Sequence, residues 1–215
     1  MPFTTAEFFD VFRRYNEAVW PLQVVLLAAA VAVVVRALPP RRNADRLGML
    51  VVATFWLWMG VVYHFAFFRQ INPAAAAFAV LFVVQGGVFV WLGARNNYIT
   101  LRPRRGIVGT AGALLIVYAI VLYPVIGLLD GHRYPATPTF GAPCPTTIFT
   151  LGVLLWAERP VPRGTVVIPA LWAVIATVAA LQLQVREDFG LTIAAVIAVP
   201  IILSSRQRGT LATAL

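Results

Sequence analysis

Long apolar runs separated by short polar stretches dominate the chain. Seven such runs lie at about residues 19–35, 47–68, 73–94, 107–129, 144–157, 165–185 and 189–204. A helix needs about 20 mostly apolar residues to cross the hydrocarbon core of a bilayer, and six of the runs come close to that length. The pattern therefore predicts an all-α, polytopic transmembrane helix bundle. The connections leave no room for a second domain, so residues 1–215 are expected to form a single integral membrane domain.

The segment before the first run has a different pattern. Within residues 3–17, Thr4 and Glu7 have the spacing of a capping box, which marks a helix start. Aromatic residues then recur at helical intervals, at Phe8, Phe12 and Tyr15. Charged side chains occupy the other faces, so we expect a short amphipathic helix that lies in the membrane interface.

Composition agrees with a membrane protein and argues against other classes. The chain is 60% hydrophobic and 12% charged, with a mean hydropathy of +0.84, whereas soluble domains carry roughly 25% charged residues. The net charge is +9, and all 17 basic residues are Arg, placed mainly between the apolar runs. That distribution reflects membrane topology rather than a nucleic-acid-binding patch. The expected surroundings are therefore a lipid bilayer, and no nucleic acid is expected as a partner.

The fifth run, at 144–157, is short for a transmembrane helix, and the Arg distribution bears on whether it crosses. With seven spans, 12 Arg residues fall on one side and 5 on the other. Without the fifth crossing, the split becomes 9 against 8. Because Arg collects on the cytoplasmic side of membrane proteins, the asymmetry favours seven spans. This orientation places the N-terminus outside and the C-terminus in the cytoplasm.

Candidate chemistry collects at the outer ends of the predicted helices. A helix from the fifth run would rise only about 20 Å at 1.5 Å per residue, so its start should lie below the outer surface. The Pro-rich segment before it would need to be buried by protein or to line a cavity. A helix start also favours anions and thiolates. We therefore predict an outward-facing cavity lined by His64, Tyr123, His132, Cys144, Thr146 and Thr147.

Some of these residues could bind a metal ion. Imidazole and thiolate suit zinc or copper, so His64, His132 and Cys144 form a candidate metal set, although their spacing matches no metal-binding motif. A haem held by the two histidines is an alternative, whereas the absence of Lys excludes a retinal Schiff base. Purely structural roles also remain open, with His64 as an aromatic-belt residue and Cys144 as a small buried side chain.

Three function classes follow from this cavity. The first is binding or transport of a small ligand or metal ion, and the second is a membrane enzyme or redox partner that uses Cys144, His64 and His132. The third is a non-catalytic scaffold whose N-terminal helix and outer loop dock another protein. Gln85 is the deepest polar side chain expected, and no carboxylate falls inside a predicted span. A proton pump with a buried acid relay is therefore not expected.

Several stretches resemble a known family. They include Trp20-Pro21, the segment from Trp56 to His64, Asn72-Pro73, and the segment from Gly131 through Pro143-Cys144-Pro145 to Thr150. Together these stretches resemble a family of bacterial polytopic membrane proteins known only as a domain of unknown function, and the resemblance covers nearly the whole chain. It implies a multi-pass protein of the bacterial cytoplasmic (inner) membrane. It implies no activity and no catalytic residue.

Overall fold

The protein is a helical bundle, seen here in a computed structural model that describes residues 1–38, 44–95 and 99–212. The α-helices are α1 (Thr5–Val19), α2 (Leu22–Ala37), α3 (Ala44–Trp58), α4 (Ala75–Ala94), α5 (Ile107–Val117), α6 (Tyr123–Leu129), α7 (Pro143–Leu155), α8 (Val167–Leu183) and α9 (Phe189–Ala212). Two π-helical segments, η1 (Met59–Phe67) and η3 (Tyr118–Leu122), continue α3 and connect α5 to α6. Short 3₁₀ turns are η2 (Phe68–Gln70), η4 (Arg163–Val166) and η5 (Arg186–Asp188).

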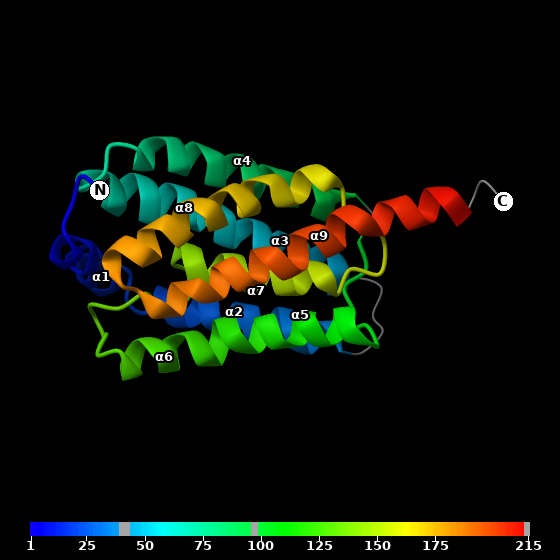
Figure 1. The fold of residues 1–215 in the computed structure, drawn as a ribbon, viewed down its shortest axis with the longest axis horizontal. Coiled ribbons are helices and arrows are strands. Elements are labelled where there is room, and N and C mark those ends of the chain that lie inside the picture. Colours follow the sequence, from blue (N-terminus) through cyan, green and yellow to red (C-terminus); the bar gives the residue numbers. More distant parts are fainter. Residues whose placement is uncertain (39–43, 96–98, 213–215) are drawn as a thin grey trace.

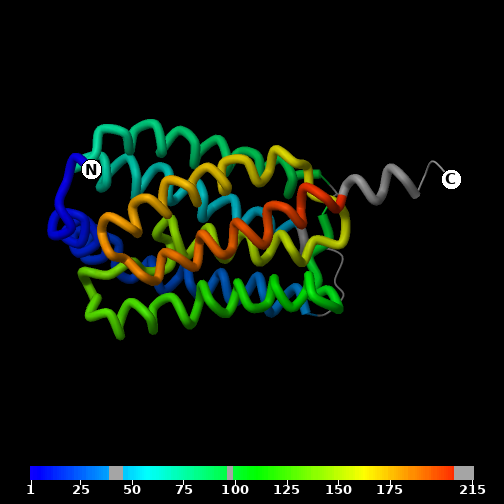
Figure 2. Tube along the Cα trace, viewed as in Figure 1, coloured from blue at the N-terminus to red at the C-terminus, as the bar shows by residue number. Residues whose placement is uncertain are grey.

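The long helices lie side by side along the bundle axis and alternate in direction (Figures 1 and 2). All seven predicted apolar runs are helical. Within the described ranges, five helices are long and apolar enough to cross a membrane. A sixth span results if α1 and α2, which meet at an angle of 85°, are counted as one bent crossing. The predicted all-α bundle with apolar, membrane-length helices is therefore confirmed.

Helix α1 covers one end of the bundle, which we call the α1 end (Figure 1). The predicted capping box is present, with the Thr4 hydroxyl accepting from the Glu7 N–H and the Glu7 carboxylate accepting from the Thr4 N–H. The aromatic face of α1 is buried against this chain, because the Phe12 and Tyr15 rings pack on Tyr63 of η1. The predicted helix is therefore confirmed, and protein rather than lipid covers its aromatic face.

Helix α7 lies in the middle of the bundle, and this position explains why it can be short. It packs against α5, η3, α8 and α9, and the Trp56 indole N–H of α3 donates to Thr150 Oγ1 at 3.1 Å. All residues of α7 except Cys144 are buried. Protein therefore surrounds this helix on all sides. Because its neighbours shield it from lipid, α7 does not need the length of a lipid-facing helix.

Small residues let α5 and α7 approach closely. A Cβ added at Gly152 would lie 2.9 Å from the Gly112 carbonyl oxygen, so the two backbones are in direct contact. Near this crossing, the Trp156 indole N–H donates to the Gly109 carbonyl at 3.0 Å. Gly at a helix crossing serves the same purpose in other membrane bundles.

Candidate functional site

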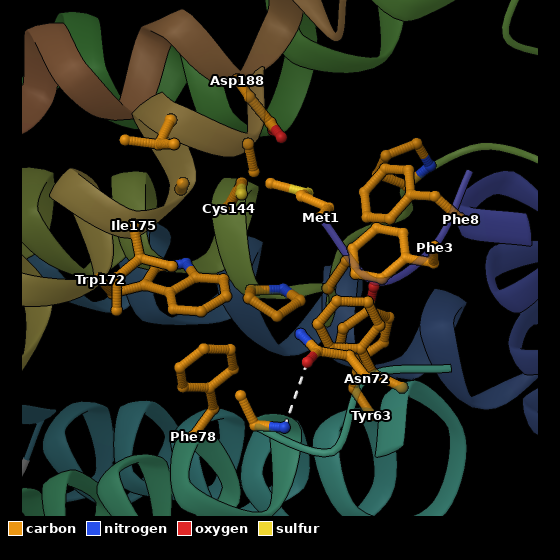
Figure 3. A pocket seen from close by; sticks show the side chains of 18 of the residues that line it. Met1, Phe3, Phe8, Tyr63, Asn72, Phe78, Cys144, Trp172, Ile175 and Asp188 are labelled. Carbon is orange, nitrogen blue, oxygen red and sulfur yellow. Dashed lines mark hydrogen bonds between the residues drawn. The ribbon is translucent and has the colours of Figure 1, made fainter. Parts of the chain in front are cut away.

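A cavity of about 430 Å³ opens beside α1 at the α1 end of the bundle. We call it the end pocket (Figure 3). Its walls come from the segment before α1, from α1 itself, from η1, η2 and the start of α4, and from α6, the start of α7 and η5, with α8 along one side. The lining is mostly apolar and aromatic, and includes Phe3, Phe8, Phe12, Tyr63, Phe68, Phe78, Trp172 and Ile175. Apolar walls with a few placed polar groups are typical of small-molecule sites.

The polar wall of the end pocket is formed by Asp188, Tyr123 and Cys144. Asp188, in the turn before α9, is only 5% exposed, and its Oδ1 accepts a hydrogen bond from the Tyr123 hydroxyl at 2.5 Å. The Cys144 thiol, in the first turn of α7, lies beside the Asp188 carboxyl group (Figure 3). Three elements far apart in the sequence therefore bring a carboxyl, a phenol and a thiol to one wall.

A second buried carboxyl lies next to this wall. Glu187 is fully buried, and its Oε1 lies 2.8 Å from Nδ1 of His132. Its Oε2 has no hydrogen-bond partner among the described residues. The Phe9 ring packs on the His132 ring with centroids 4.4 Å apart, so α1 covers the pair. Tyr118 donates from its hydroxyl to the Glu187 carbonyl at 2.8 Å, which holds the turn in place.

His64 lies away from the polar wall. Its ring is fully buried in an aromatic cage, with the Phe82 and Trp172 centroids at 4.5 and 5.1 Å. Neither of its ring nitrogens has a hydrogen-bond partner in the described part of the chain. His64 is not among the residues that line the end pocket, whereas Trp172 is. The indole of Trp172 therefore packs on His64 and faces the pocket.

The two predicted threonines are buried in the first turn of α7 rather than exposed to the pocket. The Thr146 hydroxyl accepts from the Gly141 N–H at 3.0 Å, and the Thr147 hydroxyl has no partner within the described ranges. The helix start is also a weak anion site, because Pro143 and Pro145 have no N–H and the Thr146 N–H is directed to the Ala142 carbonyl. The acidic group at this helix start is the protein's own Asp188.

The six predicted residues are therefore only partly brought together. Tyr123 and Cys144 line the end pocket, and Tyr123 also faces a neighbouring cavity of about 360 Å³ that is lined by His132. Among the described residues, no three His, Cys, Asp or Glu side chains lie close enough to hold one metal ion. The structure thus does not assemble His64, His132 and Cys144 into a metal centre. His132 contacts Glu187 instead.

Sequence reasoning missed the two buried carboxyl groups and Trp172. Glu187 and Asp188 stand at the edge of the last predicted span and read as an ordinary polar turn. Both carboxyl groups are buried in the structure although they lie outside the predicted spans. The available signal was the pairing of two adjacent acids within a very short connection between apolar helices.

A hydrogen-bonded segment closes the pocket region from the side of α1. Asn16 is fully buried, and its side-chain amide donates to the carbonyls of Pro135 and Thr137 at 2.6 and 2.8 Å. Its Oδ1 accepts from the Thr139 hydroxyl at 2.7 Å. The Pro-rich segment 130–142 is thereby tied to α1. Its last part, residues 140–142, is buried as expected, whereas Arg133 and Tyr134 are exposed.

Comparison with known proteins identifies a family but no activity. No curated protein and no solved structure matches the chain. Residues 5–213 match the model of a family of unknown function, DUF6064. This match spans nearly the whole chain, in agreement with the resemblance seen in the sequence. The chain therefore belongs to the DUF6064 family.

Proposed function

We propose that this chain is a multi-pass protein of the bacterial cytoplasmic membrane that binds a small ligand in the end pocket. In this proposal the α1 end faces away from the cytoplasm, and seven helices cross the bilayer. The alternating helix directions and the placement of 12 of 17 Arg residues on the opposite side support this orientation. With α7 enclosed by its neighbours, its crossing requires no contact with lipid.

The orientation can be tested with reporter fusions at the two termini. Seven spans predict an N-terminus outside and a C-terminus inside, so only a C-terminal green fluorescent protein should fluoresce. An exported phosphatase should be active only at the N-terminus. Six spans would place both termini on the same side, and this result would overturn the proposed topology.

One observation supports ligand binding most directly. The end pocket is an apolar cavity of about 430 Å³ with a carboxyl, a phenol and a thiol on a single wall. Sites for small molecules generally have volumes of about 300–1,000 Å³ and a few convergent polar groups. Binding is favoured over passage through the bundle because Trp56, Met59 and Phe82 fill the adjacent core.

The other function classes have less support. Reactive cysteines lie in electropositive, accessible surroundings, whereas the Cys144 thiol lies in an apolar pocket beside a carboxyl group. A scaffold that docks partners through the aromatic face of α1 would need that face free. The face packs on this chain instead.

A pocket-filling variant tests the proposal. Ala179 of α8 lines the end pocket, so Ala179→Leu should occupy part of its volume and weaken ligand binding. Ala170 lies on the same helix, is also half-buried and is not among the lining residues, so Ala170→Leu is a matched control. Small-molecule binding to detergent-purified protein can be followed by native mass spectrometry and calorimetry. Equal binding by both variants would rule out the end pocket as the site.

A further inference from the structure

We infer that the end pocket takes an organic cation, namely a small amine with an apolar body whose charged nitrogen lies at Asp188. This inference rests on the proposed function and adds the chemical class of the ligand. It is carried by the charge balance at the polar wall and by the aromatic character of the remaining walls.

Among the described residues, no positively charged group pairs with the Asp188 carboxyl group at the polar wall. Glu187 has His132 as its partner at 2.8 Å. Asp188 contacts the Tyr123 hydroxyl and the Cys144 thiol, and both of these groups are uncharged. A buried carboxylate normally needs an opposite charge or several hydrogen bonds to offset its desolvation. Because Asp188 faces the pocket, a cation bound there would supply that charge.

Other positive groups at this end are not paired with Asp188. Met1 lines the pocket, but its terminal ammonium forms no ion pair among the described residues, and the nearby Arg side chains have other partners. Arg186, next in sequence to the acidic pair, is exposed and lies 3.3 Å from Asp130. On α1, Arg13 pairs with Asp10 and Glu17. The described ion pairs at this end therefore leave Asp188 to a ligand rather than to an Arg of the same chain.

The other walls suit the rest of such a ligand. Aromatic rings attract cations held over their faces and also bury apolar groups. Phe12, Tyr63, Phe68 and Trp172 all line the cavity. Two of these rings, Phe12 and Tyr63, are stacked with centroids 5.3 Å apart and form a continuous wall.

The same features disfavour other ligand classes. An anionic ligand would lie against the Asp188 carboxyl and meet repulsion. A bare divalent cation needs six or more oxygen ligands, or a set of nitrogen and sulfur ligands. No group of three such side chains exists among the described residues. A fully apolar ligand would leave the carboxyl without a new partner. An amine with an apolar body can place its charged nitrogen at the polar wall and its apolar part against the aromatic walls.

Three probes of matched size test this inference on the purified full chain. They are 2-cyclohexylethylamine, 2-cyclohexylethanol and 3-cyclohexylpropionate, which present a cation, a neutral hydroxyl and an anion on the same apolar body. Hydrogen bonds to charged groups contribute about 1.5–3 kcal/mol, so the amine should bind about 10- to 100-fold more tightly than the alcohol. The carboxylate probe should bind most weakly. Binding is measured by calorimetry in detergent.

Asp188→Asn removes the ionisable carboxyl group while keeping nearly the same side-chain shape. The asparagine can keep the hydrogen bond from Tyr123, so the alcohol should bind as before while the amine loses its advantage. If the amine and the alcohol bind equally to the unaltered protein, the cation inference is wrong and the pocket proposal stands. If none of the probes binds, or if Ala179→Leu binds all of them unchanged, the pocket proposal itself is wrong. The comparison on the unaltered protein decides the question even if Asp188→Asn does not fold.

Discussion

Replacing Asn16 with alanine should weaken the contact between α1 and segment 130–142 at the α1 end. The side chain is fully buried and makes three hydrogen bonds to segment 130–142. Each such bond contributes about 0.5–1.5 kcal/mol, so losing all three should lower the free energy of unfolding by about 2–4 kcal/mol. Ala restores none of them, since it has no polar side-chain atom. Two carbonyls and a hydroxyl would be left unsatisfied.

The variant is compared with Glu17→Ala in detergent. Glu17 is the next residue on α1 and is exposed, so its replacement should change stability by less than about 0.5 kcal/mol. Denaturant or thermal unfolding gives the stability difference. Hydrogen–deuterium exchange should show faster exchange in 130–142 and in α1 for Asn16→Ala only.

Two results would refute the role assigned to Asn16. The first is a loss of less than about 1 kcal/mol, which a single ordinary hydrogen bond would explain. The second is faster exchange in α1 with no change in 130–142, since the hydrogen bonds connect those two segments. Either result would mean that other contacts hold the segment over the pocket.

Two further predictions concern other parts of the chain. Gly152→Ala should cost about 1–3 kcal/mol in thermal unfolding, because the added Cβ meets the Gly112 carbonyl at 2.9 Å. The control Gly87→Ala should be neutral or stabilising, since a Cβ there meets nothing within 4 Å. Hydrogen bonds from Thr4 lower the pKa of Glu7, so its contribution to helix capping is present above the unfolded pKa and is lost as pH falls through the folded pKa. Exchange in the first turn of α1, corrected for its intrinsic pH dependence, should rise on acidification, and in Glu7→Gln this response should be absent.

The helices could be predicted from the sequence because apolar runs of membrane length leave the backbone few alternatives. In a bilayer each backbone polar group must be satisfied internally, so an apolar run becomes a helix. Local signals also identified the start of α1, where Thr4 and Glu7 form the capping box. Which face of a helix meets protein was less predictable. The aromatic residues of α1 have a pattern that suits either lipid or a protein surface, and only the tertiary structure distinguishes the two.

Side-chain contacts between distant helices could not be predicted in the same way. The contact of Asn16 with Thr137 joins residues 121 positions apart, and nothing local marks it. The same holds for Tyr123 and Asp188, which are 65 positions apart. For His64 the sequence allowed two environments and could not distinguish them. Its position near an outer helix end was compatible both with a ligand site and with the aromatic cage that it occupies. Spacing along one chain carries information on helix faces but little on which faces meet.

The start of α7 lines a cavity, and the structure changes the kind of ligand that this cavity is expected to favour. Sequence reasoning took the short helix to begin below the surface and expected its positive end to attract an anion from outside. In the structure, prolines remove two of the N–H groups there, and the carboxyl of Asp188 already lies beside Cys144. Once the protein supplies the negative charge itself, the site favours the opposite sign in its ligand. A carboxyl in a cavity with aromatic walls is therefore the physical basis for expecting a cation at the end pocket.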